Sequence, residues 1–102
     1  MDTAANQETR GIGYQPSLVE VERRNRIRVA VAAYAVECWD NPIMKPGDYD
    51  CLAENIHREL ATGHNSLDRF FACEFTPLAT DWVRDHPEID KIEKLYKQRI
   101  KA

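Results

Sequence analysis

The sequence predicts an all-α protein, a small bundle of about five helices built on a helix hairpin. Two observations carry this prediction: apolar residues recur at helical spacing, and no hairpin turn of the Asn-Gly kind separates two alternating runs. A length of 102 residues fits one domain. Residues 1–16 contain two of the four glycines and few large apolar groups, so burial cannot offset their ordering entropy. We therefore predict a mobile amino-terminal arm, residues 1–16, and a single helical domain, residues 17–102.

The first helix is predicted to begin after Ser17, because Ser17 and Glu20 have the spacing of a capping box. Nothing interrupts it before residues 40–42, Asp-Asn-Pro, so it spans about 22 residues. One stripe at helical spacing consists of Ile27, Val31, Tyr34 and Cys38. Alanines at 30, 32, 33 and 35 extend this apolar surface around almost the whole circumference of the helix. We therefore expect this helix to be the central one.

A second helix is predicted from Pro46 to Leu60, with Gly63 placed for a left-handed carboxyl-terminal cap. Its apolar stripe consists of Tyr49, Leu52, Ala53, Ile56 and Leu60. Two consecutive helices with a short connection favour an antiparallel hairpin. We expect the Ile27/Tyr34 side of the first helix to pack against the Tyr49/Ile56 side of the second.

Three shorter helices complete the predicted bundle. Asn65 or Ser66 caps the third, which carries Leu67, Phe70 and Phe71. Thr76 and Pro77 begin a fourth of one or two turns that carries Leu78, Trp82 and Val83. The cap pattern at residues 85–88 precedes the last, with Ile89, Ile92, Leu95, Tyr96 and Ile100.

Charge and hydropathy narrow the class of protein. The chain has 14 Lys and Arg against 17 Asp and Glu, and residues 40–75 alone have seven acids against three basic residues. Its longest apolar run, residues 29–36, is well below the ~20 residues of a membrane helix. Residues 1–10 lack the apolar stretch of a secretory signal. We expect a cytoplasmic protein that does not associate with membranes.

In a reducing compartment the three cysteines are thiols, and we expect them to be buried structural residues. They are Cys38, Cys51 and Cys73, whose spacing fits neither a disulfide framework nor a zinc site. The pair Glu54 and His57 has the Glu-x-x-His spacing of di-iron bundles, but no second pair follows. The sequence also lacks a Gly-x-Ser-x-Gly nucleophile and a phosphate-binding loop. We predict no enzyme activity, metal or cofactor.

Two kinds of residue are candidates for partner binding. Trp39 ends the first helix and Trp82 lies on a short helix with weak local support, so either is a candidate exposed anchor in a protein interface. Arg23 and Arg24, with Arg26 and Arg28, form a basic cluster. Nucleic-acid binding through this cluster is disfavoured because acids lie nearby and the chain is acidic overall.

Residues 34–43, YAVECWDNPI, and residues 46–52, PGDYDCL, carry a resemblance to a known family. They resemble the small amino-terminal helical domain of bacterial NAD-dependent DNA ligases, over about residues 27–60. In that family a helix hairpin closes over the nicotinamide mononucleotide half of NAD. The resemblance implies that Tyr49 and Asp50 match the second half of the nucleotide motif, with Tyr34 and Glu37 as further candidates. Val36 and Glu37 stand where the family has Tyr and His.

These observations leave three functional hypotheses in order of preference. The first is a small non-catalytic interaction or accessory protein that uses the ligase-like hairpin to bind a protein partner or a second copy of itself. Resemblance and size point to a phage or mobile-element inhibitor. The second is a nicotinamide-nucleotide binding module at Tyr34, Glu37, Tyr49 and Asp50. The third is a nucleic-acid-binding accessory protein.

Overall fold

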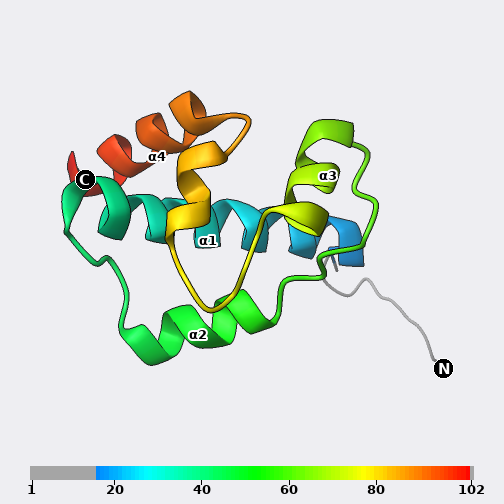
Figure 1. Ribbon diagram of the computed structural model, residues 1–102, viewed down its shortest axis with the longest axis horizontal. Helices are drawn as coiled ribbons and strands as arrows, with labels where there is room; N and C mark the ends of the chain where they lie inside the picture. The colour runs from blue at the N-terminus through cyan, green and yellow to red at the C-terminus, as the bar shows by residue number, and fades with distance from the viewer. Residues whose placement is uncertain (1–15, 102) are drawn as a thin grey trace, which may run out of the picture.

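The computed structural model describes residues 16–101, which are helical and contain no strand. The elements are α1 (Leu18–Trp39), α2 (Pro46–Glu54), α3 (Asn65–Cys73), the 3-10 helix η1 (Asp81–Asp85) and α4 (Ile89–Lys101). The long helix α1 lies in the middle, with α2 on one side and α4 on the other (Figure 1). The all-α prediction is confirmed, although this range holds four α-helices and one short 3-10 helix instead of five. The predicted arm, 1–16, lies outside the described residues except for Pro16.

Helix α1 follows the sequence prediction closely. The Ser17 hydroxyl accepts the Glu20 backbone N–H at 3.2 Å, and the Glu20 carboxylate accepts the Ser17 N–H at 3.1 Å. The helix ends at Asp40, which adopts the left-handed conformation with φ 48°. Residues 29–35 are all buried, four of them alanines that let neighbouring elements approach closely. The capping box and the central position of this helix are confirmed.

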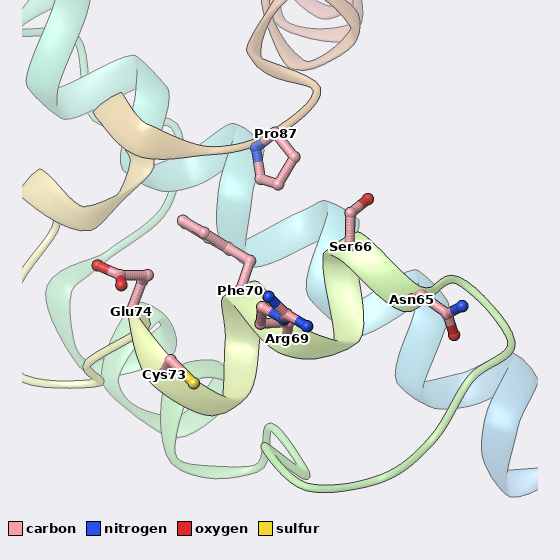
Figure 2. A pocket seen from close by; sticks show the side chains of 7 residues that line it. All are labelled: Asn65, Ser66, Arg69, Phe70, Cys73, Glu74 and Pro87. Carbon is pink, nitrogen blue, oxygen red and sulfur yellow. The ribbon is translucent and has the colours of Figure 1, made fainter.

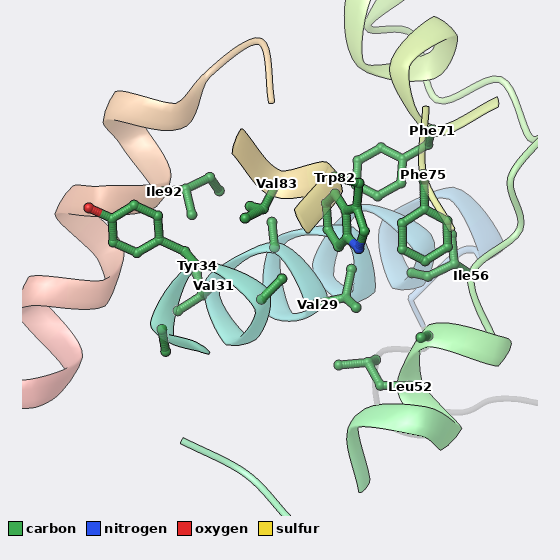
Figure 3. Packing of buried hydrophobic residues seen from close by; sticks show 14 of the residues in the cluster. Val29, Val31, Tyr34, Leu52, Ile56, Phe71, Phe75, Trp82, Val83 and Ile92 are labelled. Atoms are coloured by element: carbon green, nitrogen blue, oxygen red, sulfur yellow. The ribbon is translucent and has the colours of Figure 1, made fainter. Parts of the chain in front are cut away.

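The hydrophobic core surrounds the middle of α1 and takes side chains from every other element (Figure 3). Its large members beyond α1 are Leu52, Ile56, Phe70, Phe71, Phe75, Trp82, Val83, Ile92 and Tyr96. The Trp82 ring of η1 meets two aromatic rings edge to face: Phe71 of α3, with centroids 5.8 Å apart, and Phe75 just after α3, with centroids 4.8 Å apart. Such pairs add about 0.5–1.5 kcal/mol beyond the area they bury.

The second helix is shorter than predicted, because α2 ends at Glu54 and not at Leu60. Beyond Ile56 the backbone bonds to side chains of α1 instead of continuing the helix. The carbonyls of His57 and Leu60 accept hydrogen bonds from Arg26 at 2.8 and 3.1 Å. Gly63 has the expected positive φ, 93°, but it lies nine residues past the end of α2 and directly before the cap of α3.

The predicted contact between the first two helices is wrong in detail. Ile27 is 47% exposed, and the Tyr34 ring packs edge to face on Tyr96 of α4 with centroids 5.6 Å apart. The α1 residues that line a hollow with Tyr49 are Ala32 and Val36. Helix α1 therefore packs against α4 along the stripe that the sequence assigned to the hairpin.

The shorter elements differ from prediction mainly at their starts. Helix α3 is capped by His64, whose Nδ1 accepts the Leu67 N–H at 3.4 Å, and not by Asn65 or Ser66. The fourth predicted helix is only the five residues of η1, and Leu78 before it is 93% exposed. The Ala79 carbonyl accepts hydrogen bonds from the Tyr49 hydroxyl and the Trp82 indole, so side chains fix this segment. Helix α4 matches the prediction.

The cysteine prediction is wrong, since Cys38, Cys51 and Cys73 are all exposed thiols. Cys38 lies in the last turn of α1. A helix of 22 residues is about 33 Å long, whereas the 13 residues of α4 cover only about 20 Å. Neighbours therefore bury the middle of the α1 stripe and leave Ile27 and Cys38 at its ends exposed.

Candidate functional site

Helices α1 and α4 present an exposed apolar surface where the two helices meet. Ile27 of α1 is 47% exposed and Leu95 of α4 is 39% exposed. These two side chains line two adjoining hollows of about 210 Å³ and about 230 Å³. We call this region, comprising Ile27, Leu95 and the two hollows beside them, the α1–α4 surface. Contiguous exposed apolar patches occur at interaction sites, at ligand-binding grooves and at aggregation-prone surfaces.

The first hollow, of about 210 Å³, lies between α1, α3 and α4. Besides Ile27 and Leu95, its apolar lining consists of Leu67, Phe71 and Ile92. The second hollow, of about 230 Å³, lies between α1, α4 and the connection before α2. Its apolar lining adds Val31, Ile43 and Met44.

Basic side chains border both hollows. Arg23 and Lys91 line the first, while Arg28 and Arg99 line the second, whose lining includes no acid. Glu88, the acid of the first hollow, is bonded to Lys91 at 3.2 Å and to His64 at 3.3 Å. The hydrogen bond from Lys91 lowers the pKa of Glu88. The surface is therefore locally basic on a chain whose net charge is −3.

A buried charged network fixes the wall of the first hollow. Arg26 is 5% exposed and Glu22 is 1% exposed, and the Arg26 Nε lies 2.6 Å from a Glu22 carboxylate oxygen. Arg26 Nη1 donates to Asp68 of α3 at 2.9 Å, and its guanidinium lies 5.0 Å from the Phe71 ring centroid. The second Glu22 oxygen accepts the His57 N–H at 2.9 Å. Buried charges need such complete pairing, and here the pairing ties α3 and the 57–62 segment to α1.

His86 forms another part of this wall and is neutral at pH 7. Its ring packs against Phe70 with centroids 5.3 Å apart, and its Nδ1 accepts the Glu88 backbone N–H at 2.9 Å. Burial lowers the pKa of His86 to about 4. This imidazole therefore contributes an uncharged lining to the first hollow.

The residues of the predicted nucleotide site are only partly brought together. Tyr49 and Asp50 line a hollow of about 330 Å³ between α2 and residues 77–80. The Tyr49 hydroxyl donates to the Ala79 carbonyl at 3.0 Å, and burial raises the pKa of Tyr49. Tyr34 is directed to α4 and is not part of this hollow.

Glu37, the fourth predicted residue, is held at the edge of the same hollow by two donors. Its carboxylate accepts the Thr80 hydroxyl at 2.7 Å and the Arg84 Nε at 3.1 Å. The Thr80 hydrogen bond is the main reason that the pKa of Glu37 is lowered. Glu37 therefore links α1 to η1. Of the four predicted residues, only Tyr49 and Asp50 line the hollow.

The predicted partner-binding residues fall in three different environments. Trp82 is buried in the core, whereas Trp39 is 49% exposed and stacks on Tyr96 with centroids 5.8 Å apart. Arg23 borders the first hollow and donates to the Thr62 carbonyl, while Arg24 is exposed. Because Arg26 is buried and paired, the four arginines do not form one basic face. Nucleic-acid binding stays a prediction.

Leu95 is one of the apolar residues predicted on the last helix, and the spacing of α4 contains a signal for its exposure. Successive residues of a helix are about 100° apart, so Ile92 and Tyr96 lie in the middle of the apolar arc. Leu95 and Ile100 lie at its two edges. The middle pair is buried and the edge pair is exposed.

A wider hollow of about 610 Å³ runs along α3 and faces Pro87 (Figure 2). Arg69 lines it one turn before Cys73 and Glu74, which line it at the end of α3. Its apolar groups are Pro87 and the edge of the buried Phe70 ring. This lining places one basic and one acidic side chain, Arg69 and Glu74, beside Pro87 and Phe70, and it defines no ligand class.

The described residues contain neither a membrane-spanning helix nor a metal-binding cluster. No helix within residues 16–101 has the length and hydropathy to cross a membrane. In the same range, no three His, Cys, Asp or Glu side chains converge in a way that could hold a metal ion. Comparisons with protein-family models, curated proteins and solved structures found no match.

Proposed function

We propose that this chain is a small non-catalytic interaction protein that binds a protein partner through the α1–α4 surface. The observation that carries the proposal is the exposure of Ile27 and Leu95 side by side between two hollows. A single exposed apolar residue is ordinary on a protein surface, but adjoining ones from two helices form a patch.

The surroundings of this patch support binding to protein. Interfaces combine an apolar centre with a polar rim, and arginine is enriched in them. Here the apolar centre is Ile27 and Leu95, and the rim includes Arg23, Arg28 and Arg99. The packed network behind the first hollow gives a rigid platform, which reduces the ordering cost of binding.

The proposal is tested by comparing what the wild-type chain and matched variants retain from the native lysate. Leu95→Lys and Ile27→Lys should each lose the retained partner, because a charge is placed at the apolar centre. Leu78→Lys is the control, since Leu78 is 93% exposed and lines neither of the two hollows. Equal retention by all four proteins would exclude the α1–α4 surface as the interface.

A second candidate function is nicotinamide-nucleotide binding, which the shared hollow of Tyr49 and Asp50 favours. Calorimetry with NAD and nicotinamide mononucleotide tests it. Asp50→Ala should abolish binding, whereas Asp48→Ala, also exposed in the first turn of α2 but outside this hollow, should not. Absence of heat at millimolar ligand would reject this function.

A further inference from the structure

We infer that the partner segment on the α1–α4 surface is an acidic amphipathic helix, which inserts two apolar side chains spaced i and i+4 into the two hollows. This inference rests on the proposed function and specifies the partner's chemistry. It follows from the size, the spacing and the charge of the two hollows.

The size of each hollow suits a side chain better than a free small molecule. Small-molecule sites usually measure about 300–1,000 Å³. The hollows measure about 210 and 230 Å³, and Ile27 and Leu95 line both of them and so separate them. Each hollow is therefore suited to one apolar anchor of a macromolecular partner.

The spacing of the hollows matches one turn of a helix. On α1 the first hollow is lined from Arg23 to Ile27 and the second from Ile27 to Val31. This shift of four residues corresponds to about 6 Å along the helix axis. Side chains at i and i+4 on a partner helix are separated by about the same distance, and helix-in-groove binding uses such anchors.

The charge of the rim determines the polar face of the partner. Both hollows are bordered by cations, and the one acid among their lining residues, Glu88, is already paired with Lys91 and His64. Acidic residues beside the apolar anchors would face Arg23, Arg28 and Arg99. Complementary charge of this kind raises the association rate and fixes orientation.

A second copy of the chain fits this surface less well. Its acidic helix is α2, which carries Asp48, Asp50 and Glu54. The apolar residues of that helix, Leu52 and Ala53, are buried in its own core. The helix therefore has no pair of exposed apolar anchors to insert.

The experiment uses the full chain and two synthetic helical peptides of about 18 residues, five turns each. Both peptides carry Leu at i and i+4; one has Glu at the flanking positions and the other has Lys. Fluorescence anisotropy should show that the Glu peptide binds at least tenfold more tightly. Leu95→Ala should weaken binding of the Glu peptide at least tenfold, and Leu78→Ala should not.

The double charge reversal Arg28→Glu with Arg99→Glu sharpens the test. Both residues border the second hollow and both are exposed, so the fold should persist, which circular dichroism checks. The reversed chain should bind the Lys peptide more tightly than the Glu peptide. Equal binding of the two peptides by the wild-type chain would overturn the inference.

The remaining outcomes separate the inference from the proposed function. Suppose that neither peptide binds, but Leu95→Lys still abolishes binding of a cellular partner. The inference of an acidic helix is then wrong, whereas the α1–α4 surface remains the proposed interface. If Leu95→Lys leaves binding of that partner unchanged as well, both the inference and the proposed function are wrong. A dimer in light scattering that Leu95→Lys dissociates would assign the surface to a second copy and overturn the inference.

Discussion

Two neighbouring residues of α1, which line the same hollow, are held in very different ways. Arg26 is charged and buried, whereas Ile27, the next residue, is apolar and half-exposed. Arg26 lies at the junction of α1 with α3, where its guanidinium meets two carboxylates and two backbone carbonyls. Ile27 lies on the α1–α4 surface, where no element of residues 16–101 covers it fully.

At these two positions, whether a side chain is buried depends more on the hydrogen-bond and packing partners around it than on its hydropathy. The 57–62 segment leaves helical hydrogen bonding, so its carbonyls need donors, and Arg26 supplies them. Ile27 gains nothing comparable within the described fold. The α3 junction therefore contributes stability, and we expect the α1–α4 surface to contribute binding.

Removal of the Arg26 charge is expected to lower the free energy of unfolding more than any other change considered below. Arg26→Met leaves the Glu22 carboxylate buried beside the His57 N–H alone, and breaking such a pair costs about 3–5 kcal/mol. Urea denaturation measures the loss, with exposed Arg24→Met as the control. The double variant Glu22→Gln with Arg26→Met should lose less than the sum of its single variants. Full additivity would show that the two side chains are not coupled.

The second largest effect is expected from acid, because protonation of His86, which packs against α3, should lower the free energy of unfolding. Its pKa is lowered from 6.5 to about 4 in the fold, so below pH 6.5 the unfolded chain binds a proton that the folded chain does not. Stability from this group is complete above pH 6.5 and falls as the pH approaches 4. The difference corresponds to at most about 3 kcal/mol.

The pH effect is measured by urea denaturation at intervals between pH 7 and pH 4. His86→Asn keeps an acceptor for the Glu88 N–H and does not titrate, so its stability should change less over this range. The nearby charges are His64 and Glu88, which both proteins retain. Parallel pH profiles for the two proteins would contradict the assignment to His86.

The capping box at the start of α1 gives a smaller effect that belongs to neither region. Ser17→Ala removes the acceptor of the Glu20 N–H and should cost about 1 kcal/mol. Thermal unfolding measures this, and Ser17→Asp should restore most of the loss. A null result would show that the first turn does not take part in the cooperative unit.

The smallest effect on stability is expected at the α1–α4 surface, in contrast to the large effect expected at Arg26. Ile27→Ala and Leu95→Ala should each change stability by no more than about 1 kcal/mol, because both side chains are substantially exposed. Val83→Ala, fully buried, should cost more. If the two surface variants unfold the protein, the patch is part of the core and both proposals lose their basis.

Local sequence signals predicted the elements that local interactions determine. Ser17, Glu20 and the alanines of α1 act within one helix, and the structure places that helix as expected. The end of α2 depends on Arg26, thirty-one residues before the carbonyl of His57, and helical periodicity does not report such a contact. The Glu22–Arg26 spacing of four residues allows an ion pair within one helix, but it does not show that the pair is buried.

The candidate site was less predictable for the same reason. Tyr49 and Asp50 share a hollow, which their adjacency in the sequence allows, but Tyr34 points to Tyr96 of the last helix. Ile27 and Leu95 are 68 residues apart, and only the packing of α4 on α1 brings them to one surface. A sequence pattern identifies each as apolar and cannot show that they meet.

The three exposed thiols have a practical consequence for all of these measurements. Cys38, Cys51 and Cys73 lie on α1, α2 and α3, and each is accessible to oxidants and to other molecules in solution. Purified material kept in air should form disulfide-linked chains that imitate assembly in a sizing column. Light scattering with and without a reductant separates this artefact from association through the helices. The same thiols give three positions for attaching dyes, of which Cys51 lines a hollow together with Arg28 and Arg99 and is therefore the least suitable for binding measurements.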